Sequence, residues 1–112
     1  MVQLTNPAKY RHRVTLQKHE SYQDDELNWV TGWNDHVTVW AKILGLRGKE
    51  IIEAGASSVK ITNRIYIRYR DGIDETMRIK FGDRYFEIVH VNNLEERNVE
   101  IEILANEVRP SG

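Results

Sequence analysis

The segment Val59–Val91, VKITNRIYIRYRDGIDETMRIKFGDRYFEIVHV, decides the fold. In its first part apolar side chains alternate with polar or charged ones, which is the period of a strand with one buried and one solvated face. Only Asn63 interrupts the apolar series. Asp71-Gly72 and Gly82-Asp83 tolerate the positive φ of tight turns, and alternation resumes after each pair. The segment therefore predicts three antiparallel strands joined as a meander.

Shorter alternating runs on both sides of this segment supply the rest of a core. They predict strands at residues 12–19, 36–43 and 99–105, with the charged run Glu20–Asn28 as an exposed hairpin tip. About six strands without a long amphipathic helix are typical of a small closed β-barrel, because closure hides both the apolar faces and the sheet edges. We therefore expect an all-β fold, a closed barrel of antiparallel strands.

The domain boundaries follow from the same pattern. We expect one domain over residues 1–112, with a flexible arm at residues 1–11 and a frayed tail at residues 107–112, where the sequence is polar and unpatterned. Residues 44–58 (LGLRGKEIIEAGASS) are glycine-rich, and their helix-compatible run is too short to be stable alone. They predict one long inserted loop, and long loops in compact domains are often functional.

Composition narrows the function classes. The 112 residues carry 16 Lys and Arg against 17 Asp and Glu, a net charge of −1, so no global basic field argues for binding to nucleic acid. The absence of cysteine removes disulfides, thiolate metal sites and cysteine nucleophiles. No segment has the length of apolar sequence that a signal peptide or a membrane-spanning helix needs. We expect a soluble protein made inside the cell, with no membrane partner.

Catalytic and metal-binding patterns are absent from the sequence. The four histidines have no metal-ligand spacing, and the adjacent carboxylates of Asp24-Asp25-Glu26 do not converge without help from elsewhere. The run that follows Asp71-Gly72 lacks the ligand spacing of a calcium loop. We therefore expect neither an enzyme nor a protein with a cofactor.

The most distinctive surface is a row of cations and one aromatic on a predicted strand: Arg64, Tyr66, Arg68 and Arg70. Such a face is used by modules that bind single-stranded nucleic acid, as in an OB-like barrel. The competing interpretation is that the cations decorate an exposed strand opposite glutamates on its neighbour, for which Glu100 and Glu102 are candidates. The neutral chain favours the second interpretation, and both remain open at this point.

Several stretches together resemble the head-closure proteins, also called head-tail joining or stopper proteins, of long-tailed bacteriophages and prophages. The likeness extends from His12 to Val108 and rests on a combination of motifs rather than on any one. These are the basic start RHRVTLQ, WNDHVTVWAKILGLRGKE with its Leu46, Gly48 and Glu50, the strand NRIYIRY and the hairpin DRYFEI. Asn63 stands where many relatives carry histidine, which leaves the patterning intact.

The resemblance implies a structural virion protein of the head-tail connector, made in the cytoplasm of a bacterial host. It implies a homo-oligomeric ring, commonly twelve-fold, that closes the DNA-filled capsid and offers a surface to the tail. Its implied partners are portal or adaptor proteins, a tail completion or tail-tube protein, and the phage DNA in the channel. The residues of the implied channel loop are Leu44, Gly45, Leu46, Arg47, Gly48, Lys49, Glu50, Ile51, Ile52, Glu53, Ala54 and Gly55.

Ring contacts of this kind are heterologous, so two different faces of one subunit must be complementary. A basic face with Arg64, Tyr66, Arg68 and Arg70 that meets an acidic one with Glu100 and Glu102 is the candidate subunit interface.

Overall fold

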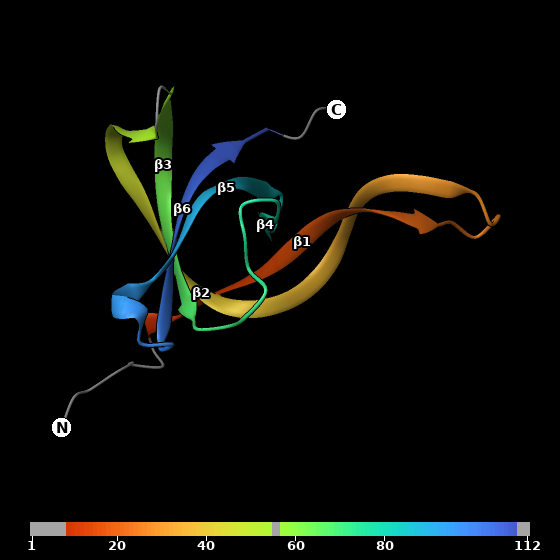
Figure 1. The fold of residues 1–112 in the computed structure, drawn as a ribbon, viewed down its shortest axis with the longest axis horizontal. Helices are drawn as coiled ribbons and strands as arrows, with labels where there is room; N and C mark the ends of the chain where they lie inside the picture. Colours follow the sequence, from red (N-terminus) through yellow and green to blue (C-terminus); the bar gives the residue numbers. More distant parts are fainter. Residues whose placement is uncertain (1–8, 55–56, 110–112) are drawn as a thin grey trace.

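A computed structural model describes residues 9–54 and 57–109. It contains six strands and one turn of 3-10 helix: β1 (His12–Gln23), β2 (Trp29–Ala54), β3 (Ser57–Arg68), β4 (Arg78–Phe81), β5 (Arg84–Asn93), η2 (Leu94–Glu96) and β6 (Glu100–Val108). The strands close into an antiparallel barrel in the order β1-β2-β3-β6-β5-β4 (Figure 1). The expected fold class, a closed barrel of six antiparallel strands, is confirmed.

The expected meander of three consecutive strands is wrong. β3 lies between β2 and β6, whereas β4 pairs with β5 and with β1. In the closed ring β3 and β4 therefore lie on opposite sides, and the chain between Tyr69 and Met77 must cross one end of the barrel. Gly72, at φ +84°, belongs to this crossing and not to a hairpin turn, whereas Gly82, at φ +59°, occupies the predicted turn between β4 and β5.

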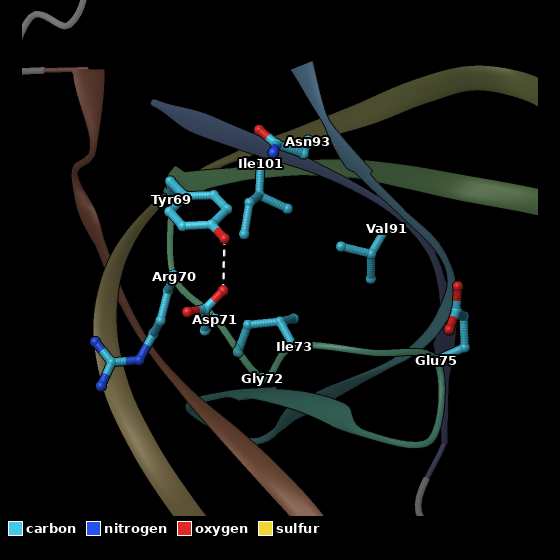
Figure 2. A pocket seen from close by; sticks show the side chains of 9 residues that line it. All are labelled: Tyr69, Arg70, Asp71, Gly72, Ile73, Glu75, Val91, Asn93 and Ile101. Atoms are coloured by element: carbon cyan, nitrogen blue, oxygen red, sulfur yellow. Dashed lines mark hydrogen bonds between the residues drawn. The ribbon is translucent and has the colours of Figure 1, made fainter. Parts of the chain in front are cut away.

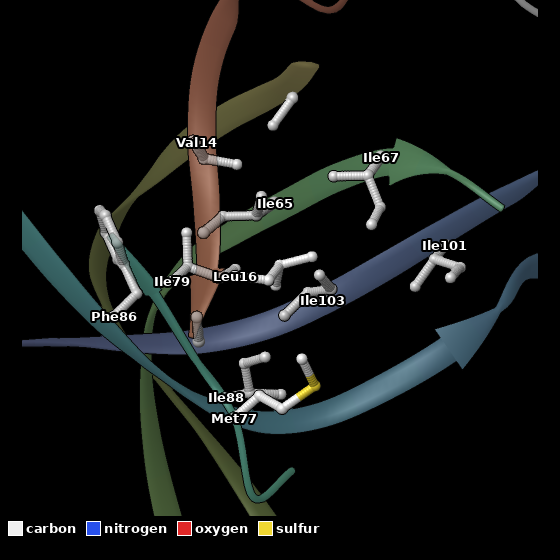
Figure 3. Packing of buried hydrophobic residues seen from close by; sticks show 12 residues of the cluster. Val14, Leu16, Ile65, Ile67, Met77, Ile79, Phe86, Ile88, Ile101 and Ile103 are labelled. Carbon is white, nitrogen blue, oxygen red and sulfur yellow. The ribbon is translucent and has the colours of Figure 1, made fainter. Parts of the chain in front are cut away.

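Alternation places the core as expected. Inward side chains from all six strands meet inside the barrel, and Figure 3 shows Leu16, Ile65, Ile79 and Ile103 pointing toward one another. Burial of a large aliphatic side chain contributes about 1.5–3 kcal/mol, so this cluster dominates the stability of the fold. The buried cluster is Val14, Leu16, Ala41, Ile65, Ile67, Met77, Ile79, Phe86, Ile88, Ile101, Ile103 and Ala105.

The expected loop at residues 44–58 is instead a β-hairpin. β2 continues to Ala54 and β3 begins at Ser57, with paired residues from Glu50 opposite Ile61 to Ala54 opposite Ser57. The ladder is interrupted between Gly45 and Glu50, where the register shifts. The glycines that suggested a loop therefore mark an irregularity within a strand, as glycine in strands often does.

Side-chain contacts hold residues near both borders of the described chain. Residues 1–8 of the expected arm lie outside the described residues, but Tyr10 is buried and its hydroxyl donates to Glu100 Oε2 at 2.6 Å. At the other end Glu107 and Val108 belong to β6, and Arg84 forms a bidentate pair with Glu107 at 2.8 and 2.9 Å. Ordered structure thus reaches into the segment that was expected to fray.

Candidate assembly surfaces

The candidate interface residues on β3 and β6 face each other within one chain. The register places Tyr66 opposite Glu102 and Arg68 opposite Glu100. The Tyr66 hydroxyl donates to Glu102 Oε2 at 2.7 Å, while Glu100 Oε2 accepts from Tyr10 and pairs with Lys9 Nζ at 2.6 Å. The two carboxylates therefore have partners on the subunit that carries them.

Cations surround the two phenol rings of this face. Lys9 Nζ lies 5.5 Å and Lys42 Nζ 5.7 Å from the centre of the Tyr66 ring, and the Arg68 guanidinium lies 5.7 Å from that of Tyr10. These are cation–π distances. Burial, then the hydrogen bond to Glu102 and its charge, raise the pKa of Tyr66 to about 12. The same causes, with Glu100 as the partner, raise the pKa of Tyr10 still further.

Arg68 fits the interpretation in which a strand cation lies opposite a glutamate on the neighbouring strand, whereas Arg64 lies opposite Leu104. Arg70 differs from its companions because it follows the end of β3, beyond the last pair with β6. Figure 2 shows its side chain pointing away from the adjoining pocket. Whether the predicted interface residues also touch another subunit stays a prediction.

The predicted channel residues form the outer part of the β2–β3 hairpin, which extends beyond the barrel (Figure 1). Leu44 and Gly45 still pair with β3 at the barrel wall, and Glu50 to Ala54 pair again beyond the irregularity. Gly55 lies outside the described residues. The channel segment is thus one continuous projection, stiffened by a backbone ladder.

The exposed hairpin tip predicted at Glu20–Asn28 belongs to a longer projection, here called the arm, made of residues 18–34, because β1 and β2 extend further into it than predicted. In the described chain these residues pair only with each other, from Lys18 opposite Asn34 to Gln23 opposite Trp29. The arm extends sideways from the barrel in Figure 1. Leu27 is 73% exposed and Trp29 72% exposed near its end. Trp29 is the sequence signal for this exposed apolar end, because a tryptophan beside a charged hairpin tip does not belong to the buried face of a barrel strand.

The base of the arm is fixed by a stacked arginine. The Arg78 guanidinium lies between the rings of Trp33 and Tyr85, 4.4 and 4.3 Å from their centres, and its Nε donates to Gln17 Oε1 at 2.7 Å. Gln17 is buried and its amide donates to Asp35 at 2.8 Å. Burial lowers the pKa of Arg78 from its ordinary value, yet a guanidinium stays charged in proteins. These contacts tie the arm to β4 and β5.

Comparison with known proteins identifies the family. The model of the family described as "Phage head completion protein" matches residues 5–108. The chain belongs to the phage head completion protein family. Its sequence is 26% identical to head completion protein gp7 of Enterobacteria phage HK97 over 74 residues, which is 66% of each chain.

Solved structures share the fold. The solution structure of protein SF1141 from Shigella flexneri 2a is 30% identical, with a TM-score of 0.67 over 96% of this chain and 100% of that one. A chain from the virion of a native gene transfer agent particle has a TM-score of 0.61 at 17% identity, over 88% of this chain and 94% of that one. The second likeness concerns the fold alone.

As a member of this family the head completion protein is a structural component of the phage virion. The family is a structural one, which agrees with the expectation of no catalytic role. The OB-like alternative is not favoured, because the family match covers nearly the whole chain. Within residues 9–54 and 57–109 no helix is long and apolar enough to cross a membrane.

Proposed function

We propose that this head completion protein assembles as a ring below the portal, closes the DNA-filled capsid and presents a surface to the tail. The observation that carries the proposal is the β2–β3 hairpin, which extends from a closed barrel whose strands need no partner for its core. A rigid barrel with a long projection suits a ring whose bodies form the wall and whose hairpins reach inward.

The hairpin suits a gate better than a loop would. Its backbone ladder holds residues 50–54 in a fixed pairing with β3, whereas a loop would sample many positions. The segment carries both signs of charge, with Arg47 and Lys49 beside Glu50 and Glu53. Mixed charge gives few net phosphate contacts, so DNA can be retained and later released.

The partners of such a ring follow from its position. One face meets the portal or an adaptor protein, the other meets a tail completion or tail-tube protein, and the phage DNA passes through the channel. The twelve-fold symmetry that the resemblance implies would place a hairpin from every subunit around the same opening. Subunits in a ring contact one another through two different faces.

The test shortens the hairpin without touching the barrel. Glu50 and Ile61 are paired, so residues 51–60 can be replaced by Asn-Gly, which closes a two-residue turn. The melting temperature of the purified protein should stay within a few degrees, because a projecting hairpin adds little to the core. Particles complemented with this variant should leak DNA or fail to mature, measured as DNA retained per particle and as infective titre.

A matched control keeps the length of the hairpin and changes its apolar side chains. The triple variant Ile51→Thr, Ile52→Thr and Val59→Thr preserves strand propensity and reach, so particles that carry it should retain DNA. If the shortened variant enters particles that hold their DNA and infect normally, the gating role is wrong.

A further inference from the structure

An open groove lies at the end of the barrel where β1 begins and β3 ends. It has a volume of about 260 Å³ and is lined by Arg13, Val39, Trp40, Arg68, Tyr69 and Arg70. Trp40 is 53% exposed, and Arg13 stacks on it with its guanidinium 5.0 Å from the ring centre. The groove thus combines three cations with an apolar and aromatic floor.

These cations are available to a ligand. Among the described residues none of Arg13, Arg68 and Arg70 forms an ion pair, although the carboxylate of Glu100 lies opposite Arg68. That carboxylate is already bonded to Tyr10 and Lys9. The three arginines therefore retain most of their capacity for carboxylate or phosphate binding.

The tip of the arm has the complementary chemistry. Asp25 and Glu26 are exposed carboxylates, and Leu27 and Trp29 are exposed apolar side chains beside them. The tip is held in one conformation, because Asp24 Oδ1 accepts from the backbone N–H groups of Glu26 and Asn28, both at 2.9 Å. A preorganised segment loses less conformational entropy on binding than a flexible one.

A subunit cannot place its own tip in its own groove. β1 runs for 12 residues from beside the groove to the tip, which at about 3.3 Å per residue is about 40 Å. The two features lie toward opposite ends of the long axis of the molecule (Figure 1), whose extent is 55 Å. Complementary surfaces at opposite ends of one chain produce head-to-tail contacts between copies.

We propose that the tip of the arm docks in the arginine-lined groove of a second copy of this chain. Asp25 and Glu26 pair with Arg13, Arg68 or Arg70, while Leu27 and Trp29 pack against Trp40 and Val39. The contact is heterologous and repeats around a closed assembly, so the inference rests on the proposed ring. It replaces the pairing of Arg68 with Glu100 of another subunit by a pairing with Asp25 or Glu26, neither of which forms an ion pair within the described part of its own chain.

Phosphate is the other ligand that arginines accept, and DNA is present in the particle. The second copy is favoured because it satisfies the apolar floor as well as the cations, and because it covers Leu27 and Trp29, which are otherwise the most exposed large apolar side chains described. DNA would leave both of these side chains in water.

The experiment uses the absence of cysteine from the native chain. One full-length variant carries Asn28→Cys beside the tip, which leaves Asp25, Glu26, Leu27 and Trp29 intact, and a second carries Arg70→Cys in the groove. Mixed under mild oxidation, the two should form a disulfide-linked heterodimer about tenfold faster than Asn28→Cys mixed with Glu87→Cys, an exposed control site on β5.

Charge exchange tests the pairing. Adding Glu26→Arg to the tip variant should slow the cross-link about tenfold, and adding Arg13→Glu to the groove variant should restore it. Equal rates with Arg70→Cys and Glu87→Cys would overturn the proposal. So would binding of a fluorescent DNA duplex that Arg13→Glu abolishes and Glu26→Arg leaves unchanged, together with no selective cross-link, since the groove would then be a phosphate site.

A chain with both Asn28→Cys and Arg70→Cys separates this proposal from the proposed function. In particles it should give a ladder of cross-linked multimers on a denaturing gel. If the protein is in particles that retain DNA but no ladder forms, the docking contact is wrong and the proposed function stands. If the heterodimer forms in solution but the protein is absent from particles, the contact stands and the proposed function is wrong.

Discussion

Adjacent residues of β3 serve opposite purposes. Ile65 and Ile67 are fully buried in the barrel, whereas Tyr66 and Arg68 lie on the outer face among carboxylates and cations. The period of two in a strand makes this division, and a shift of one residue would exchange the two sets. Substitutions at neighbouring positions should therefore affect stability by different mechanisms.

Ile67→Asp should unfold the protein. The change removes a buried aliphatic side chain, which costs about 2–5 kcal/mol, and adds a charge without a partner. Domains of this size are stable by only about 5–15 kcal/mol. The matched control is Arg68→Gln, which should cost no more than about 0.5 kcal/mol because that side chain is exposed. Thermal melts that show similar losses for the two variants would contradict the register.

Tyr66 should make the protein sensitive to alkali. Its pKa is raised from an ordinary value of 10 to about 12, so the protonated phenol stabilises the folded state. This contribution is complete below pH 10 and is lost as the pH rises through about 12. Tyr66→Phe should cost about 0.5–1.5 kcal/mol at neutral pH, the usual contribution of one hydrogen bond. Urea unfolding of the variant should depend less on pH between 10 and 12.

The pKa of Tyr10 is also raised, so the Tyr66→Phe variant should keep part of the alkaline sensitivity of the wild type. Glu102→Gln is the control, because it keeps an acceptor for the hydroxyl and removes the charge that raises the pKa of Tyr66. If the stability of Tyr66→Phe fell with pH between 10 and 12 as steeply as that of the wild type, the pKa of Tyr66 would not differ between the folded and unfolded protein, and the prediction would be wrong.

At the scale of elements, strand alternation predicted which residues are buried and could not predict which strands pair. Asp71-Gly72 has the composition of a hairpin turn, but β3 already lies between β2 and β6, so the chain crosses to β4 instead. There Tyr69, Asp71 and Ile73 line a pocket of about 300 Å³ at the barrel end (Figure 2). Barrel closure is a property of all six strands and leaves no local signal.

The full length of the two projections was not predicted, for a related reason. Residues 18–34 have no buried side chain, so no period of buried positions marks their strands in the sequence. The outer β2–β3 hairpin pairs beyond a register shift, which alternation alone does not predict. Their strands are held by backbone pairing and by contacts at their bases. The candidate interface residues of β3 and β6 have partners within the chain that depend on the register between these two strands, which the sequence alone did not give.

Arg78→Ala should loosen the arm. The variant loses the guanidinium between Trp33 and Tyr85 and leaves the buried Gln17 oxygen without its donor, which costs about 1–3 kcal/mol. Amide hydrogen exchange in residues 18–34 should accelerate more than exchange in the barrel strands, because the contacts lie at the arm's base. Arg78→Lys should give an intermediate effect, since it keeps the charge and loses the planar stack.

Arg84→Ala is the control for this experiment. Arg84 also lies over an aromatic ring, that of Phe86 at 5.1 Å, and pairs with Glu107, but these contacts are on β5 and β6 and not on the arm. The Arg84→Ala variant should leave amide hydrogen exchange in the arm unchanged. Equal acceleration in both variants would mean that the arm responds to global stability and not to the Arg78 stack.

At the scale of the whole molecule the chain is more extended than a compact domain. Its radius of gyration is 15.4 Å, against about 13 Å for a compact domain of this length. The exposed large apolar side chains are dispersed over separate regions: Leu27 and Trp29 at the arm's end, Trp40 beside the groove and Leu44 near the β2–β3 hairpin. Among the side chains that the structure describes, no single face therefore offers the large apolar area of an obligate oligomer.

The purified protein should accordingly be a monomer or a small oligomer in dilute solution. A hairpin tip in a groove buries far less than the roughly 1,200 Å² of a stable interface, so a contact of this kind between two free subunits is weak. In the proposed ring each subunit would be held in place by its neighbours and by the surface below, which would raise the effective concentration of tip and groove. Multi-angle light scattering should give a mass near 13.2 kDa, or a small multiple of it. A stable closed ring at the lowest concentrations would contradict this prediction, because it would show that the subunits assemble without the connector as a template.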